Sequence, residues 1–171
     1  RTSFSIYGIR FVRCASHFTG NEGKSMKRIL IVDDHEENLY LLRVLLEGNG
    51  YEVQQAANGS EALAKALESK QDLIISDILM PVMDGFTLCR ALKADERLKD
   101  IPLIFYTATY RDSRDEKLAL DMGANAFIIK PSEPDEFMRR VEEILAANKE
   151  GTLNASQKQI ADDKIILKEY N

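Results

Sequence analysis

Four short apolar runs occur along the chain, and each is followed at once by a residue whose side chain can take part in chemistry. The runs and the residues after them are 28–32 before Asp33 and Asp34, 72–76 before Asp77, 102–106 before Thr107, and 126–129 before Lys130. Continuous apolar runs of this length are typical of strands that are buried on both faces, as in a parallel sheet. The pattern therefore predicts a buried sheet whose strands end on candidate functional groups.

The segments between these runs have apolar residues at helical spacing. In residues 35–47 the apolar positions Leu39, Leu42 and Leu46 recur every three or four residues, and Gly48 ends the stretch. The other elements expected on these grounds are a strand at 51–56 and helices at 59–69, 85–94, 111–122 and 134–148. Five strands that alternate with five helices predict an α/β fold with a doubly wound parallel sheet.

The expected topology brings the functional groups together. Crossover connections in such folds are right-handed, so every strand of the sheet ends at the same edge. In the strand order 2-1-3-4-5, the ligand site lies at the switch point between the first and third strands. Asp33, Asp34 and Asp77 would meet there, with Thr107 and Lys130 beside them.

Composition and charge narrow the class of protein. The 171 residues are 44% hydrophobic and 30% charged, which suits one domain with tails. The net charge is −5, of which the first 25 residues carry +3 and the remainder −8. An acidic body argues against direct nucleic-acid binding.

No apolar run approaches the roughly 18 residues of a membrane span. Cys14 and Cys89 form no metal or disulfide pattern, so we expect a cytoplasmic protein without a membrane anchor.

Local composition divides the chain into three segments. Residues 1–25 hold three arginines and a single acid, Glu22. Their composition is similar to that of an organellar transit peptide, but we interpret them as an upstream extension. Residues 26–148 form the predicted domain, and Met26 directly precedes its first strand. Residues 149–171 are polar and then amphipathic, as expected for a linker that becomes helical.

Three carboxylates at one sheet edge repel one another unless a cation neutralises them. Mg²⁺ is the natural candidate, because it binds a few carboxylates and completes an octahedral shell with water or substrate oxygens. Mg²⁺, the Lys130 ammonium and the Thr107 hydroxyl around an aspartate would form a receptor for a phosphoryl group. One aspartate would then act as the nucleophile and form an acyl phosphate. The residues alone leave open which of the three aspartates is the nucleophile. Asp77 is a single aspartate at its strand end, whereas the adjacent Asp33 and Asp34 are better suited to binding a metal.

Several motifs in these segments resemble those of the receiver domain of two-component response regulators. They are IleLeuIleValAspAsp at 29–34 with Asn38, SerAspIleLeuMetProValMetAspGly at 76–85, TyrThrAla at 106–108, and LysPro at 130–131. The longest motif is highly specific, and the resemblance extends over about residues 27–147. It implies a flavodoxin-like receiver fold, a (βα)5 arrangement with the strand order given above.

The resemblance also implies a role for each residue at this edge. Asp77 would be the phosphoacceptor. The implied Mg²⁺ ligands are Asp33, Asp34, Asp77 and the backbone carbonyl of Leu79. Thr107 and Lys130 would contact phosphoryl oxygens, and the Lys130–Pro131 peptide bond would be cis.

A switch is implied as well. Thr107 would turn toward the phosphoryl group, and the ring of Phe127 would move into the space it leaves. Family members often have tyrosine at this position, so Phe127 must depend on packing alone. The sequence does not separate a moving ring from an ordinary core ring. The face formed by the fourth helix, the fifth strand and the fifth helix would change shape.

The implied partners follow from this switch. A histidine kinase or a phosphotransfer protein would be the donor. A sensory, kinase or output domain, a separate partner, or a second copy in a phosphorylation-dependent homodimer would bind the switched face. Residues 166–171 look like the helical linkers that join N-terminal receivers to sensor or hybrid kinases, so we expect a receiver within a larger protein. A single-domain regulator is the alternative.

Two other functions share some of these features. A haloacid-dehalogenase-like phosphatase also forms an aspartyl phosphate with Mg²⁺, but it needs an Asp-x-Asp motif where this chain has Asp33 and Asp34 adjacent. A pseudo-receiver binding module would lack one of the essential groups, and none is missing. His35 is open to two interpretations, a phosphodonor or an ordinary histidine of a surface loop. A signalling domain is therefore favoured over a classical enzyme.

Overall fold

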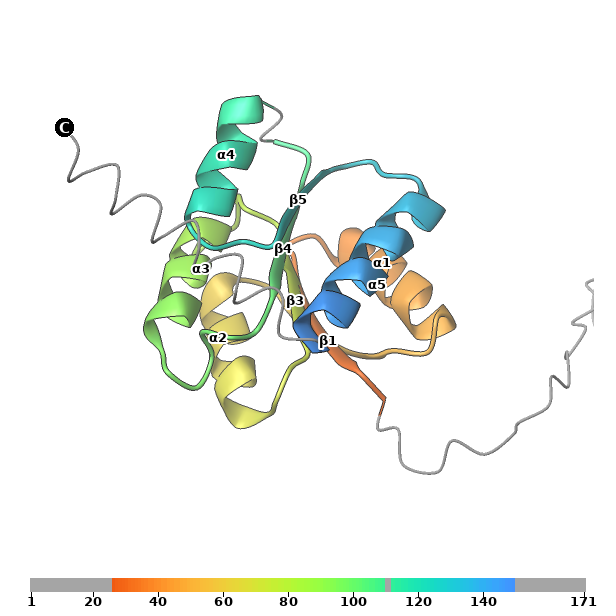
Figure 1. The fold of residues 1–171 in the computed structure, drawn as a ribbon, viewed down its shortest axis with the longest axis horizontal. Coiled ribbons are helices and arrows are strands. Elements are labelled where there is room, and N and C mark those ends of the chain that lie inside the picture. The colour runs from red at the N-terminus through yellow and green to blue at the C-terminus, as the bar shows by residue number, and fades with distance from the viewer. Residues whose placement is uncertain (1–25, 110–111, 150–171) are drawn as a thin grey trace, which may run out of the picture.

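The computed structural model describes residues 26–109 and 112–149, in which strands and helices alternate along the chain (Figure 1). The elements are β1 (Arg28–Val32), α1 (Glu36–Gly48), β2 (Glu52–Ala56), α2 (Gly59–Glu68), β3 (Leu73–Ser76), α3 (Gly85–Ala94), β4 (Leu103–Thr107), α4 (Ser113–Asp121), β5 (Ala126–Ile129) and α5 (Pro134–Lys149). The expected extension at 1–25, and all but the first residue of the expected linker at 149–171, lie outside the described residues.

The five strands form one parallel sheet in the order β2-β1-β3-β4-β5, which confirms the predicted fold class and strand order. Helices α1 and α5 cover one face of the sheet, and α2, α3 and α4 cover the other (Figure 1). Strand β1 pairs with both β2 and β3. The end of β1 therefore lies at the point where the strand order reverses, which is where ligands bind in such sheets.

Alternate residues of each strand pack into different core layers. Leu30 and Val32 of β1 belong to the layer under α2, α3 and α4, whereas Ile29 and Ile31 belong to the layer under α1 and α5. All four residues are at most 1% exposed. Because helices cover both faces, successive residues 29–32 of this central strand are all apolar, and this explains why its run is continuous rather than alternating.

Side-chain caps set where three helices begin. The N-cap residues with a capping side chain are Asn58 for α2, Asp84 for α3 and Asp112 for α4. At α4 the Asp112 carboxylate accepts from the Arg114 N–H at 2.9 Å, and the Asp115 carboxylate accepts from the Asp112 N–H at 3.1 Å. This capping box starts the helix at Ser113, two residues later than the periodicity predicts.

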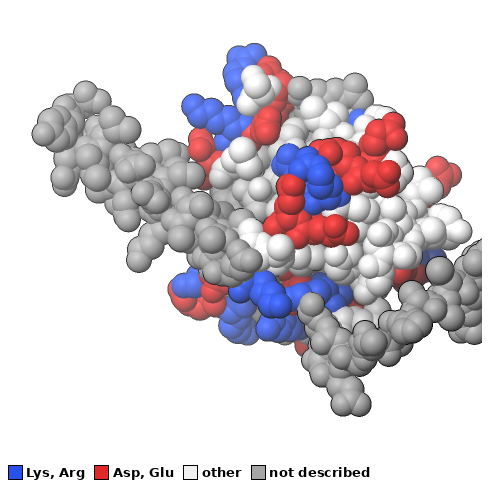
Figure 2. All heavy atoms as spheres, turned by 45° about the vertical axis from the view of Figure 1, so that its right-hand side comes forward, with Lys and Arg blue, Asp and Glu red and all other residues white. Residues whose placement is uncertain are grey.

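Charged side chains of both signs are interspersed over the face shown in Figure 2. On α5, Arg139 pairs with both Glu136 and Glu143. These opposite charges neutralise one another at the surface, unlike the acidic residues at the sheet edge. Within the described ranges, no helix is both long and apolar enough to cross a membrane.

Candidate functional site

The strand pairings bring the ends of β1, β3, β4 and β5 together. The N–H of Asp77 donates to the Val32 carbonyl at 2.9 Å, so Asp77 lies beside Asp33, the residue after Val32. The N–H of Lys130 donates to the Thr107 carbonyl at 2.9 Å, which places Lys130 against the end of β4. The structure thus gathers at one edge the residues that the sequence predicts to meet there.

The ammonium of Lys130 lies between the buried Asp33 and the partly buried Asp77. Its Nζ atom lies 2.6 Å from Oδ2 of Asp33 and 3.2 Å from Oδ2 of Asp77, and the side chains of Lys130, Asp33 and Asp77 are 13%, 1% and 11% exposed. Burial alone would lower the pKa of Lys130, but hydrogen bonds and attraction from both carboxylates outweigh it and raise the pKa. Lys130 therefore stays charged between them. The Lys130–Pro131 peptide bond is cis, which confirms that expectation.

Asp33 is the most deeply buried acid of the site. Burial raises its pKa, but hydrogen bonds from Lys130, the His35 N–H and the Asn38 amide, together with the Lys130 charge, lower it overall. The His35 N–H lies 2.9 Å from Oδ1, and Asn38 Nδ2 lies 3.1 Å from Oδ2. The contact of Asn38 with Asp33 is not among the contacts that the sequence predicts. Its position in the first turn of α1, five residues after Asp33, is the signal that could have found it.

Asp34 adds a third carboxylate, 27% exposed. Among the described residues at this edge, three carboxylates accompany one ammonium, that of Lys130, which leaves an excess of negative charge. One ligand atom from each of Asp33, Asp34 and His35 lies within 4.8 Å of the other two. Carboxylate oxygens at this spacing, partly open to solvent, fit a hard divalent ion such as Mg²⁺ that keeps several water ligands.

A cleft of about 470 Å³ opens beside these groups. Its lining residues are Asp34, His35, Asn38, Asp77, Leu79, Met80, Pro81, Ala108, Thr109 and Lys130. Asp77 and Lys130 both line the cleft, so a phosphoryl group that enters would meet the carboxylate and the ammonium together. Leu79, which is 57% exposed, forms part of the wall.

The loop between β3 and α3 folds back onto Asp77. The N–H of Ile78 donates to Oδ1 of Asp77 at 2.6 Å, and the N–H of Gly85 donates to the Ile78 carbonyl at 2.7 Å. A Cβ atom at Gly85 would lie only 2.3 Å from the Asp77 carbonyl oxygen. Glycine is therefore required at this position, where α3 begins directly against the candidate phosphoacceptor.

Thr107 and Phe127, the predicted switch residues, are buried and do not line the cleft. Oγ1 of Thr107 accepts a hydrogen bond from the Thr109 N–H at 3.3 Å. Phe127 is 8% exposed and packs in the core layer that includes Phe105 and Ala119. Because Phe105 and Phe127 are register partners, Thr107 and Phe127 lie on the same face of the sheet.

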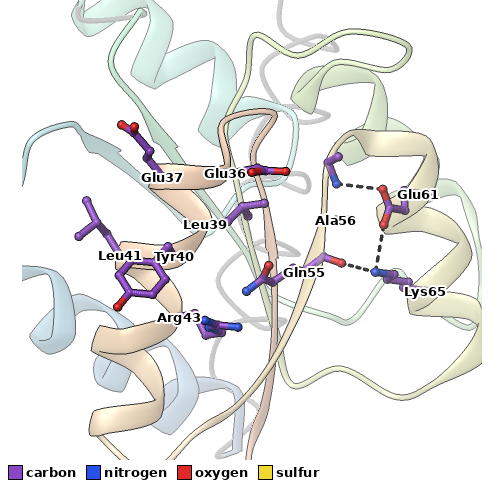
Figure 3. Close-up of a pocket in the computed structure, with 11 residues that line it drawn as sticks. Glu36, Glu37, Leu39, Tyr40, Leu41, Arg43, Gln55, Ala56, Glu61 and Lys65 are labelled. Atoms are coloured by element: carbon purple, nitrogen blue, oxygen red, sulfur yellow. Dashed lines mark hydrogen bonds and ion pairs between the residues drawn. The ribbon is translucent and has the colours of Figure 1, made fainter.

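A separate groove of about 820 Å³ lies beside the edge strand β2, between α1 and α2 (Figure 3). Lys65 of α2 pairs with Glu61 and donates to the Gln55 carbonyl. Arg43 of α1 lies over the ring of Tyr40. None of the predicted site residues lines this groove. Its basic side chains are already paired or stacked within the fold, so the cleft at Asp77 is the better candidate for chemistry.

The chain is similar to known proteins in sequence and in fold. The family model described as the response regulator receiver domain matches residues 29–142. The chain is 40% identical over 120 residues to the DNA-binding dual master transcriptional regulator RpaA of Synechocystis sp., a match that covers 70% of this chain and 49% of that protein. It is 43% identical over 115 residues to the response regulator PleD of Caulobacter vibrioides, covering 67% of this chain and 25% of that protein.

A solved structure adds information on the metal. The receiver domain of the sensor histidine kinase PA1611 from Pseudomonas aeruginosa is 29% identical, with a TM-score of 0.65 over 71% of this chain and 99% of that one. That protein holds a magnesium ion coordinated in its active-site cleft. The present chain spans about half or less of the length of the two curated relatives.

Proposed function

Because this chain belongs to the family of response regulator receiver domains, we propose that it is the phosphoacceptor module of a two-component signalling system. The observation that supports this best is the Lys130 ammonium between Asp33 and Asp77 in an acidic cleft. A histidine kinase or a phosphotransfer protein would supply the phosphoryl group, and Asp77 would receive it. The family match does not favour a haloacid-dehalogenase-like phosphatase or a pseudo-receiver.

The proposed transfer is one exchange of bonds at phosphorus. A carboxylate oxygen of Asp77 attacks, the P–N bond to the donor histidine breaks, and an acyl phosphate forms. Both oxygens of Asp77 are oriented beforehand, Oδ1 by the Ile78 N–H and Oδ2 by Lys130. A carboxylate that is already oriented loses less entropy when it attacks.

The acidic residues would hold Mg²⁺. The proposed ligands are Asp33, Asp34, Asp77 and the backbone carbonyl of Leu79. Bound there, the ion would supply positive charge to the phosphoryl oxygens. Asp33 suits this role because its lowered pKa keeps it ionised and its hydrogen bonds fix its orientation. Lys130 and the Thr107 hydroxyl would bind the phosphoryl oxygens directly.

The Thr107 hydroxyl and the Phe127 ring would transmit phosphorylation. A phosphoryl group brings about −1.5 to −2 charge and three acceptor oxygens. The Thr107 hydroxyl would turn from the Thr109 N–H toward one of these oxygens, and Phe127 would pack into the space it leaves. The change would reach the face of α4, β5 and α5, where Leu118 and Ile129 are 50% and 41% exposed. An output domain in the same polypeptide, a partner protein or a second copy would bind this face.

The outer surface of α1 would receive the phosphodonor. Tyr40, Leu41 and Val44 are 58%, 66% and 51% exposed, although all three are apolar or aromatic. Helix α1 begins at Glu36, two residues after Asp34, so its N-terminal end lies beside the cleft, which Asn38 helps to line. An amphipathic helix that carries the donor histidine would bury the three exposed side chains while it presents the phosphoryl group to the cleft.

Phosphorylation by a small-molecule phosphodonor tests the assignment. The full chain, Asp77→Asn and the control Asp72→Asn are incubated with the donor, with and without Mg²⁺, and the phosphoryl group is counted by intact mass. We expect one phosphoryl group on the wild type and on Asp72→Asn with Mg²⁺, and none on Asp77→Asn. Persistent labelling of Asp77→Asn, or labelling that needs no metal, would contradict the proposal.

A further inference from the structure

His35 is the one histidine within the described ranges, and its imidazole lies against the acidic pair. Its Nδ1 atom is 3.1 Å from Oδ1 of Asp34 and 3.3 Å from Oδ1 of Asp33. The side chain is 69% exposed, whereas that of Asp33 is 1% exposed, so the ring approaches the carboxylates from the solvent side. A ring nitrogen at these distances either donates a hydrogen bond to a carboxylate oxygen or shares a metal cation with it.

The orientation of this ring is not explained by helix capping. His35 is the N-cap residue of α1, yet its side chain makes no cap hydrogen bond. The N-cap side chains of α2, α3 and α4 each accept a hydrogen bond from the helix backbone. The imidazole is therefore directed toward the carboxylates rather than toward its own helix.

The two separations match those between neighbouring ligands of one metal ion. Metal–ligand bonds of about 2.0–2.1 Å place adjacent ligand atoms about 3.0 Å apart in an octahedron and about 3.3 Å apart in a tetrahedron. The observed values of 3.1 Å and 3.3 Å fall in this range. The ligand atoms of all three side chains lie within 4.8 Å of one another, so one ion could contact all three after the side chains adjust.

A nitrogen ligand changes which ions a site prefers. Mg²⁺ selects oxygen ligands, whereas imidazole suits Zn²⁺ and Ni²⁺, and affinity for mixed nitrogen and oxygen sites rises along the first transition row. We infer that Nδ1 of His35 joins Asp33 and Asp34 as a third ligand and makes the site prefer transition ions such as Zn²⁺ to Mg²⁺. This inference rests on the metal site of the proposed function. The consequence is that Zn²⁺ would compete with Mg²⁺ for the site beside Asp77.

Calorimetric titration of the full chain tests the ligand role. Zn²⁺ and Mg²⁺ are titrated separately into the wild type, into His35→Ala, and into His17→Ala, which removes the only other histidine. We expect His35→Ala to weaken Zn²⁺ binding at least about tenfold and to change Mg²⁺ binding by less than about threefold. His17→Ala should behave as the wild type. Equal Zn²⁺ affinity in all three proteins would overturn the inference.

A second measurement distinguishes His35 as a metal ligand from His35 as a cation that competes with metal ions for the two carboxylates. If His35 carried a proton and merely neutralised the acids, His35→Ala would strengthen the binding of both ions, and the inference would be wrong. With Co²⁺ as the probe, we expect strongly shifted imidazole proton signals in the NMR spectrum of the wild type that are missing in His35→Ala. If the wild type is phosphorylated with Mg²⁺ but shows no such signals, only the inference fails. If it neither binds Mg²⁺ nor accepts a phosphoryl group, the proposed function fails.

Discussion

The two ends of the sheet both carry ion pairs, but they differ in burial and in charge balance. At the amino end, Arg28 pairs with Glu52 at 3.0 Å and Lys27 pairs with Asp72 at 3.8 Å, so each acid has a base. The side chains there are between 26% and 47% exposed. At the carboxyl end, Lys130 is the one ammonium among the described residues that pairs with Asp33 and Asp77, Asp34 adds a third carboxylate, and these side chains are between 1% and 27% exposed.

The difference shows which end can bind a ligand. Balanced, exposed pairs are screened by water and contribute between about 0 and 1 kcal/mol to stability. An uneven set of carboxylates, of which Asp33 is buried and Asp77 partly buried, is costly unless a further cation compensates it. The charges at the amino end are therefore already balanced, whereas those at the carboxyl end are balanced only when a cation binds there.

Among the substitutions considered, replacing Lys130 should have the largest effect, a loss of phosphorylation at the carboxyl end of the sheet. Lys130→Met keeps the length of the side chain and removes the only ammonium between Asp33 and Asp77. We expect phosphorylation by a small-molecule donor to slow by about 100-fold or more, because a positioned charge at the reacting oxygens is lost. The initial rate of phosphorylation, measured by intact mass, provides the test. A rate within twofold of the wild type, on the order of experimental error in such comparisons, would contradict the role of Lys130.

The same variant should change how Asp33 titrates. In the wild type the pKa of Asp33 lies below 3.8, so this residue stabilises the fold above that pH. The contribution is lost as the pH falls through the folded value. Without Lys130, burial is opposed by fewer hydrogen bonds, so the pKa rises and the protein tolerates acid less well. The carboxyl ¹³C shift of Asp33 during a pH titration measures this, and an unchanged titration midpoint would show that Lys130 does not hold the charge.

A smaller effect is expected from the glycine that holds α3 against the site. In Gly85→Ala the new Cβ would lie 2.3 Å from the Asp77 carbonyl oxygen, so the loop must shift. We expect the free energy of unfolding in urea to fall by about 1–3 kcal/mol. Gly48→Ala is the matched control, because nothing lies within 4 Å of a Cβ there and the residue ends α1. Equal stability of the two variants would show that the close approach at Gly85 is not needed.

The smallest effect is expected at the amino end. Glu52→Gln removes the exposed partner of Arg28. We expect the free energy of unfolding to change by less than about 1 kcal/mol and the phosphorylation rate to stay that of the wild type. Urea unfolding at low and high salt, together with the phosphorylation assay, measures both. A marked loss of phosphorylation would show that the two ends of the sheet are coupled.

Much of the fold and the site could be predicted from local pattern. Strands buried on both faces must be apolar throughout, and parallel strands joined by right-handed crossovers must end at one edge. These two constraints alone place Asp33, Asp77 and Lys130 together. The contact of Asn38 with Asp33 was not predicted, because the direction of one polar side chain depends on how α1 packs on the sheet. Periodicity predicts a start of α4 two residues too early, because it does not register the capping box at Asp112.

The sequence by itself determined which chemical groups stand at the ends of the strands and in what order the strands lie. Only the tertiary structure decided how those groups are paired. Lys130 reaches Asp33 across 97 residues and Asp77 across 53, and the Thr107 hydroxyl binds the Thr109 N–H instead of lining the cleft. The physical reason is that pairing and pKa depend on burial and on distances of a few ångströms between distant segments. A local pattern of polar and apolar residues specifies neither of them.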